Sequence, residues 1–201
     1  MRFNHFINEV KPPEPRMWAM LCDDILRDCK PFIKAMKGIP YQFALWRGAK
    51  KLIDVYQISF PRADRNPTDT PRDIQNMLDK IFLKKFGWKA RSQGVFGTGS
   101  KSFAAMYGKP YMVFPMGEFK FIWSPEIKDL YTDVIEKDMR YGDWGKLPDK
   151  GFSKIEEVIE SSYTDKDWHS AIGSQNEIMI KCHSYYLVNW EFEFNGYKEL
   201  F

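Results

Sequence analysis

Three short segments of the sequence combine polar residues with apolar or glycine neighbours in patterns that suit chemistry. They are residues 45–48 (Leu-Trp-Arg-Gly), 95–100 (Val-Phe-Gly-Thr-Gly-Ser) and 174–180 (Ser-Gln-Asn-Glu-Ile-Met-Ile). A guanidinium at a strand end can grip two phosphate oxygens, and glycines let a ligand approach the backbone. A glutamate that opens an apolar strand is held by rigid backbone. Taken singly, each segment is more typical of a role without chemistry: the arginine of a surface ion pair, the glycine-rich segment of a simple turn, and the glutamate of a solvated strand end.

Several other kinds of site are disfavoured by the sequence. It contains no G-x-x-x-x-G-K-[ST] loop, no G-x-S-x-G elbow and no H-E-x-x-H pair, so the familiar nucleotidase, hydrolase and zinc-protease motifs are absent. The three histidines and three cysteines are too scattered to indicate a zinc site, and we expect no metal. The sparse, odd set of cysteines indicates reduced thiols rather than a disulfide framework.

Composition indicates a folded, water-soluble chain. The 201 residues are 44% hydrophobic and 28% charged, with a net charge of +3, which does not by itself require nucleic acid or membrane as a partner. No apolar run approaches the roughly 20 residues of a membrane span, and the first residues lack an apolar signal core. We therefore expect a cytoplasmic protein with no membrane partner.

Hydrophobic periodicity predicts helices and strands in mixed order, preceded by an extended arm over residues 1–16. Helices are expected over residues 17–36 (with a break at Pro31), 71–86, 101–107, 125–140 and 153–163, with a further turn capped by Asp165 or Asp167. Strands are expected over residues 41–47, 93–100, 111–117, 118–123, 178–182 and 185–194. The mixture favours an α+β fold.

In this order, the three segments resemble the mono-ADP-ribosyltransferase fold of bacterial toxins and exoenzymes. The family signature is an arginine, then Ser-Thr-Ser, then Gln-x-Glu or Glu-x-Glu. The corresponding residues here are Trp46-Arg47-Gly48, then Phe96 to Ser100, then Gln175-Asn176-Glu177. Between the second and third segments, an apolar strand ending in Pro115-Met116-Gly117 also fits the family. The resemblance covers about residues 40–182.

The resemblance implies a split β-sandwich of two antiparallel sheets with peripheral helices and a cofactor cleft between the sheets. We expect one domain over residues 1–201, in which residues 1–38 form an arm and a helix and residues 39–201 form the core. The interval between Thr98 and Glu177 is long for the family, so an insertion is expected near residues 125–165.

The implied activity is transfer of ADP-ribose from NAD to a macromolecular acceptor, a protein side chain or a nucleic-acid base, with release of nicotinamide. Loss of nicotinamide builds positive charge on the ribose, which a carboxylate can stabilise. Glu177 is the candidate for that role, Arg47 for gripping the pyrophosphate, and Gln175 for orienting the acceptor. The expected catalytic residues are thus Glu177, Gln175 and Arg47. The expected cofactor-binding residues are Arg47, Gly48, Phe96, Thr98 and Ser100.

The segment departs from the family at Gly97 and Gly99, which replace the two serines that flank the threonine. Two other functions therefore stay open. The chain is alternatively a non-catalytic partner-binding or virion-associated protein that keeps the fold. It is alternatively a nucleic-acid-binding module that uses the basic, aromatic-bearing segment 84–101. Compact transferases of this kind often act as toxins or as effectors in phage–host conflict, in the host cytoplasm for a phage-encoded protein.

Overall fold

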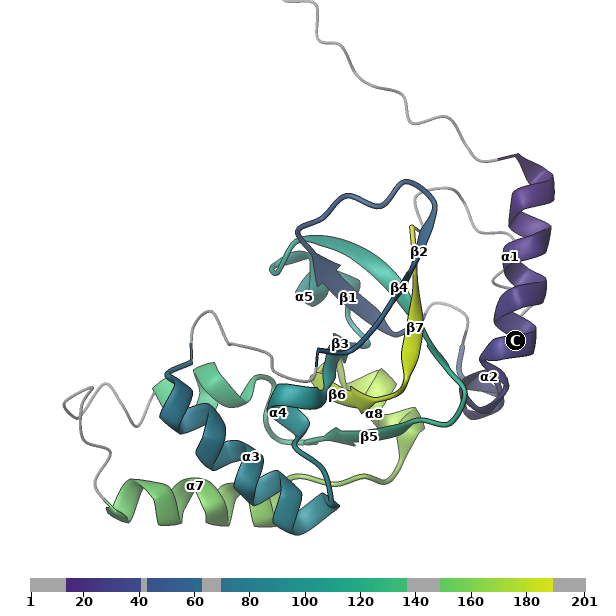
Figure 1. Cartoon of the computed structure of the whole chain (residues 1–201). Coiled ribbons are helices and arrows are strands. Elements are labelled where there is room, and N and C mark those ends of the chain that lie inside the picture. The colour runs from purple at the N-terminus through teal and green to yellow at the C-terminus, as the bar shows by residue number, and fades with distance from the viewer. Residues whose placement is uncertain (1–13, 41–42, 63–69, 137–148, 190–201) are drawn as a thin grey trace, which may run out of the picture.

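The computed structural model describes residues 14–40, 43–62, 70–136 and 149–189. Its strands form one open antiparallel sheet of seven strands in the order β2-β7-β4-β1-β3-β6-β5, with several helices around it (Figure 1). The fold is therefore mixed α+β, as the sequence predicts. The strands are β1 (Trp46–Ala49), β2 (Tyr56–Ser59), β3 (Val95–Thr98), β4 (Lys109–Met116), β5 (Lys120–Trp123), β6 (Glu177–Lys181) and β7 (Ser184–Val188). The helices are α1 (Pro15–Asp28), α2 (Lys30–Met36), α3 (Arg72–Phe86), α4 (Ala90–Gln93), α5 (Lys101–Ala105), the π-helical turn η1 (Tyr131–Ile135), α7 (Asp149–Ser162) and α8 (Trp168–Ser174).

The expectation of two separate sheets is wrong for the described strands, which share one hydrogen-bonded sheet. The join between its halves is narrow, because β1 and β3 are paired only at Trp46 and Thr98. The β4 neighbour of β1, by contrast, is paired with it along four positions. Figure 1 shows β1 and β4 running in a different direction from β5. After Thr98 the chain turns at Gly99 towards α5, which ends the ladder.

Helix boundaries follow proline and glycine, as the sequence predicts. The helical segment 17–36 is broken at Cys29, and Pro31 lies in the first turn of α2, where its missing N–H costs no intrahelical hydrogen bond. α3 begins after Pro71 and ends at Gly87, whose φ of +78° places it in the left-handed region that suits glycine. Asp167 caps α8 by accepting a hydrogen bond from the Ser170 N–H.

The prediction of one helix over residues 125–140 is wrong for most of residues 125–136, the part that the structure describes. The regular turn there is the five-residue η1, and residues 137–140 lie outside the described residues. Polar side chains divide the segment into short turns: the Ser124 hydroxyl accepts from the Ile127 N–H, and an Asp129 carboxylate oxygen accepts from the Tyr131 N–H. Such local side-chain bonds compete with a continuous helix.

The prediction and the structure differ at two strands that pair with each other, β7 and β2. β7 begins at Ser184 as a fully buried strand and ends at Val188, and the predicted continuation over residues 190–194 lies outside the described residues. β2 was not expected from the sequence; its four residues pair with β7 at the edge of the sheet. The proposed division into an arm over 1–38 and a core over 39–201 stays a prediction.

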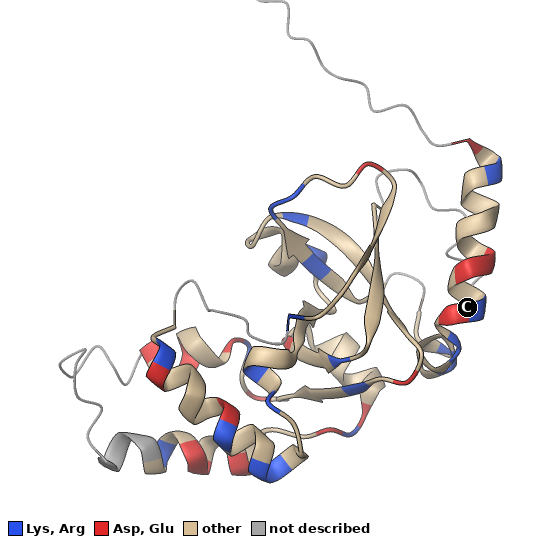
Figure 2. Cartoon of the chain, in the orientation of Figure 1, with Lys and Arg blue, Asp and Glu red and all other residues tan. Residues whose placement is uncertain are grey.

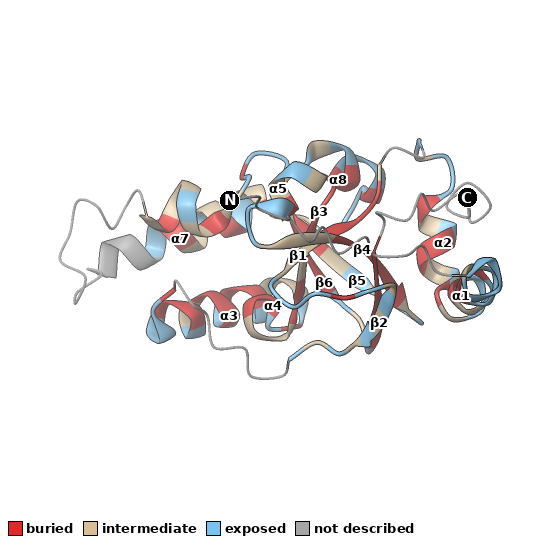
Figure 3. Ribbon diagram, turned by 90° about the horizontal axis from the view of Figure 1, so that it is seen from above, coloured by how far each residue is buried: buried red, intermediate tan, exposed pale blue. Residues whose placement is uncertain are grey.

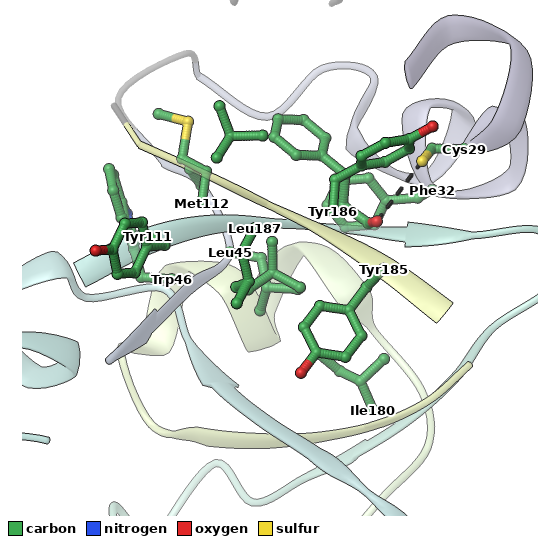
Figure 4. Close-up of a cluster of buried hydrophobic side chains, with 14 of the residues drawn as sticks. Cys29, Phe32, Leu45, Trp46, Tyr111, Met112, Ile180, Tyr185, Tyr186 and Leu187 are labelled. Atoms are coloured by element: carbon green, nitrogen blue, oxygen red, sulfur yellow. Dashed lines mark hydrogen bonds between the residues drawn. The ribbon is translucent and has the colours of Figure 1, made fainter. Parts of the chain in front are cut away.

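Buried side chains form two clusters, to both of which β5 and β6 contribute alternate residues. The first joins α1 and α2 to β1, β4 and β7, and the second lies under α3, α4 and α7 against β5 and β6. Figure 3 shows the buried residues running along the strands and along one side of α3. In the first cluster, Tyr186 points towards Cys29 and Phe32, whereas its neighbour Tyr185 points towards Ile180 (Figure 4). This alternation is what an extended strand buried on both faces requires.

The outer helices α3 and α7 each carry both acidic and basic residues, so neither is uniformly positive or negative (Figure 2). Within the described residues, no helix has both the length and the apolar composition that crossing a membrane requires. The cysteines of the described residues are free thiols. Burial raises the pKa of the Cys29 thiol to about 12 and that of Cys182 to about 12.

α1 is tied to the sheet through Asp28. The Tyr186 hydroxyl on β7 donates to the Asp28 carboxylate over 2.7 Å, and the Gly117 N–H donates to the Asp28 carbonyl over 2.7 Å. Hydrogen bonds from Arg27 and then from Tyr186 hold the pKa of the Asp28 carboxyl below its ordinary value, against the opposing effect of burial.

Replacing Tyr186 with Phe is expected to lower the free energy of unfolding by about 1.5 kcal/mol at pH 7, because a hydrogen bond to a charged acceptor is lost. A lowered carboxyl pKa stabilises the fold above the unfolded value of 3.8, and this stabilisation is lost as pH falls through the folded value. Urea unfolding at pH 7 and at pH 3 measures both effects. A Phe variant whose destabilisation is as large at pH 3 as at pH 7 would contradict the role assigned to Asp28.

Candidate functional site

The three segments identified in the sequence meet in one row of paired residues across the sheet. Thr98 on β3 pairs with Trp46 on β1 on one side and with Glu177 on β6 on the other. Directly opposed residues of antiparallel strands project to the same face, so Trp46, Thr98 and Glu177 form a row across three strands. The three segments are thereby brought together although they lie far apart in the chain, while Arg47 itself lies outside the row, one position along β1 from Trp46.

Arg47 reaches from β1 to β3. Its Nη1 donates to the Phe96 carbonyl oxygen over 2.8 Å, and the side chain is half-buried. Gly48, the next residue, is required by packing, since a Cβ atom there would overlap the Ala104 carbonyl of α5. Arg47 therefore lies beside the β3 strand that carries the second predicted segment, and Gly48 allows α5 to pack closely against β1.

Glu177 is held at the first position of β6. Its N–H donates to the Lys128 carbonyl over 2.9 Å, and its Cα pairs with that of Thr98. Its carboxylate Oε1 accepts a hydrogen bond from Arg91 Nη1 over 3.1 Å. The two side chains are 9% (Arg91) and 14% (Glu177) exposed, so the ion pair is largely removed from water.

Arg91 is a site residue that the sequence does not indicate, since in the sequence it is one of several cations of the basic segment 84–101. Its backbone N–H donates to the Asp79 carboxylate over 2.9 Å, and its guanidinium lies 4.8 Å from the centre of the Phe96 ring. Its Nε is buried and has no hydrogen-bond partner. No spacing rule would have found it, since it lies 86 residues from its partner Glu177.

Thr98 fixes the backbone of the Gln-x-Glu segment. Its hydroxyl donates to the Gln175 carbonyl over 2.7 Å, and it accepts from the Ser100 N–H over 3.1 Å. Gln175 follows α8 in the left-handed conformation, with φ of +65°, which is uncommon for a residue with a side chain. Ser100 caps α5 by accepting from the Phe103 N–H, so both hydroxyls predicted to contact a cofactor also organise the local backbone.

A depression of about 620 Å³ lies beside this row of residues. Trp46 and Gln175, which come from two of the three segments, line it together with Ser100 and Lys101. Its volume lies within the range of small-molecule sites. Glu177 and Arg47 are not among its lining residues. The full lining is Phe43, Trp46, Gly99, Ser100, Lys101, Ser102, Ala105 and Gln175.

The two glycines at the positions where the resemblance expects serines, Gly97 and Gly99, are closely packed. A Cβ atom at Gly99 would overlap the Ile172 carbonyl oxygen of α8, and one at Gly97 would lie 2.8 Å from Leu45 Cδ1. Gly99 has no room for a serine with α8 where it is, whereas a serine at Gly97 would require the Leu45 side chain to shift. Close packing by α8 and β1 thus accounts for glycine at these positions, between which Thr98 supplies the hydroxyl.

A second carboxylate lies near Glu177. The Tyr107 hydroxyl donates to Asp129 over 2.8 Å. Burial, this hydrogen bond and the negative charges of Asp129 and Glu177 raise the pKa of Tyr107 well above its usual range, while Arg91 opposes the rise. Burial opposes ionisation of Asp129, but hydrogen bonds from Tyr107 and Thr132 and the charge of Arg91 hold its pKa below the ordinary value. Asp129 therefore remains charged at neutral pH.

The basic segment 84–101 is engaged largely with its own chain. Lys84 forms an ion pair with Glu156 over 2.8 Å, and Lys85 Nζ donates to the Tyr163 carbonyl at the end of α7 over 2.8 Å. With Arg91 bound to Glu177, three cations of the segment have partners within the chain. The use of this segment for nucleic acid stays a prediction, without a continuous free cationic row to support it.

Comparisons of the chain with protein-family models, with curated protein sequences and with solved structures found no match. In the described part of the chain, no cluster of three or more His, Cys, Asp or Glu side chains is arranged to hold a metal ion. The candidate site is therefore characterised by its own geometry: a largely buried carboxylate paired with the Arg91 guanidinium, with the Arg47 guanidinium bound to the backbone of strand β3. An open depression lies beside it, lined in part by Gln175.

Replacing Gly99 with Ala is expected to lower the free energy of unfolding by about 3 kcal/mol or more, since the added methyl group meets backbone that cannot move aside cheaply. Gly173→Ala in α8 is the matched control, because a Cβ atom there has no neighbour within 4 Å. Urea unfolding of both variants measures the difference. Equal stability of the two would contradict the close packing of α8 against Gly99.

Proposed function

We propose that the chain is a mono-ADP-ribosyltransferase that transfers ADP-ribose from NAD to a macromolecular acceptor and releases nicotinamide. The observation that carries the proposal is the row Trp46, Thr98, Glu177 across three adjacent strands. It brings the arginine, threonine and glutamate segments of the resemblance to one place. Without such adjacency, three short motifs would have no chemical meaning.

Glu177 has the environment that the proposed reaction needs. The bond between the nicotinamide nitrogen and the ribose breaks with its electron pair leaving on nicotinamide, and positive charge develops on the ribose. A carboxylate fixed by β6 and by β3 pairing stabilises that charge without reorganising during the reaction. Its partial burial strengthens the electrostatic effect relative to water.

Arg47 is proposed to bind the diphosphate of NAD. A half-buried guanidinium whose Nη1 is held by the Phe96 carbonyl retains further N–H donors in a fixed fork, which suits two phosphate oxygens. The narrow join between β1 and β3 supports a cofactor that lies between two halves of the sheet, β2-β7-β4-β1 and β3-β6-β5. On this proposal the split sandwich of the family corresponds to those halves.

The depression lined by Trp46 and Gln175 is proposed to receive the acceptor. Gln175 is exposed and lies two residues from Glu177, so an acceptor bound there would be close to the ribose carbon under attack. In the family this position orients the acceptor nucleophile. The depression is also the feature that favours the alternative of a non-catalytic binding protein, which would use it without NAD.

Glu177→Gln is expected to reduce the release of nicotinamide from NAD by about 100-fold or more, the scale of losing one charge-stabilising group. Glu118→Gln, at an exposed position in the turn before β5, is the matched control and should leave the rate unchanged. The measurement is nicotinamide formed by purified protein with and without cell lysate, with transfer followed by mass spectrometry. Turnover by the Gln variant equal to that of the native chain would refute the assignment.

Arg47→Lys is expected to weaken NAD binding about tenfold, because an ammonium group cannot replace the bidentate fork. Arg72→Lys on the exposed start of α3 serves as the control. Calorimetric titration with NAD measures both affinities. If the native chain binds no NAD at millimolar concentration, the non-catalytic alternative is favoured; if both Lys variants bind as the native chain does, Arg47 has no role in binding the diphosphate.

A further inference from the structure

The Arg91–Glu177 ion pair is unusual among the ion pairs of the described residues because both partners are largely buried. The pair of Lys84 with Glu156 has side chains 69% and 43% exposed, whereas Arg91 and Glu177 are 9% and 14% exposed. Moving two charges out of water costs free energy that an apolar pair of similar volume would avoid. Stability alone therefore does not account for the choice of these two residues.

Arg91 is held from two sides, neither of which involves Glu177. Its backbone is fixed at the start of α4, where the buried Asp79 carboxylate accepts from the N–H groups of Arg91 and Ser92. Its guanidinium stacks on the Phe96 ring, whose own carbonyl binds Arg47. The guanidinium is thus a preformed group, to which the carboxylate of Glu177 adapts.

The backbone of Glu177 is fixed as well. Its N–H is bound to the Lys128 carbonyl, and its strand is paired with β3 at Thr98. With the backbone set by β3 and the loop at Lys128, the hydrogen bond from Arg91 Nη1 to Oε1 restricts the remaining side-chain rotations. A carboxylate that must meet a developing charge benefits from this restriction, because small displacements lower catalytic rates strongly.

We propose that Arg91 is the positioning residue of Glu177: it sets the orientation of the carboxylate and does not itself bind the acceptor. This inference rests on the proposed function, because it assigns the role through the reaction at Glu177. The buried Nε without a hydrogen-bond partner supports it, since a residue selected for stability alone would not leave a charged group incompletely satisfied. The contacts of Arg91 with Asp79, Phe96 and Glu177 are the observations that assign this positioning role to it.

A double-mutant cycle tests the proposal, using Arg91→Met, Glu177→Gln and the double variant in the full chain. We expect Arg91→Met to lower kcat for nicotinamide release about 10- to 100-fold, with KM for NAD changed less than about threefold. In the Glu177→Gln background, Arg91→Met should cause no further loss, because its effect passes through the carboxylate. Equal losses in both backgrounds would overturn the proposal, as would a native rate in Arg91→Met.

Two additions separate positioning from a general loss of structure. The stoichiometry of ADP-ribose binding in calorimetry gives the folded, binding-competent fraction, by which every kcat is corrected, and Arg72→Met is the control for loss of an arginine. Arg91→Lys, which keeps the charge but not the planar fork, should recover part of kcat. A corrected kcat in Arg91→Met equal to that of Arg72→Met would overturn the proposal.

The same double-mutant cycle, measured as free energies of unfolding, separates a failure of the proposed function from a failure of the Arg91–Glu177 coupling. Absence of NAD turnover in the native chain would refute the proposed function. In that case, non-additive unfolding free energies would still support the Arg91–Glu177 coupling, and additive ones would overturn it. Should Arg91→Met fail to fold, the Arg91→Met/Glu177→Gln double variant, which leaves no unpaired buried charge, supplies the comparison with Glu177→Gln alone.

Discussion

The pairing of Thr98 with Trp46 on one side and Glu177 on the other is the constraint on which the site depends. It is the single position at which β1 and β3 are paired, so it fixes how the two halves of the sheet meet. A shift of one residue along either ladder would turn the Glu177 side chain to the opposite face. Thr98 strengthens the register by binding the Gln175 carbonyl, which ties the end of α8 to β3.

The charged side chains at the site are held by contacts with neighbouring residues and are largely shielded from solvent. Arg47 and Arg91 both contact Phe96, one through its carbonyl and the other through its ring, and Arg91 in turn holds Glu177. Asp129 adds a further negative charge that Arg91 partly balances. Such an arrangement is costly in desolvation, and it resembles a preorganised polar environment more than a stabilising surface network. Of the basic segment 84–101, Arg91 thus acts inside the chain.

The sequence predicts the parts of the fold that depend on local signals. α3 matches the expected helix because Gly87 ends it. The strand expected over residues 41–47 is wrong in its bounds, since β1 begins only at Trp46 and contains both Arg47, expected at the strand end, and Gly48, expected in the turn. What it does not predict depends on distant contacts: the single sheet, the short strand β2, and the partnership of Arg91 with Glu177. Gly99 is instructive, because as sequence it looked like a lost serine, whereas α8 leaves no room for a side chain there. Only the packed structure distinguishes these two explanations.

The most direct test of the account is a crystal structure of the chain with ADP-ribose and nicotinamide bound. The account predicts the diphosphate at the Arg47 guanidinium and the ribose that carried nicotinamide beside the Glu177 carboxylate, between the halves of the sheet joined at Thr98. Ligand density that contacts neither side chain, or none at saturating ligand, would contradict the account.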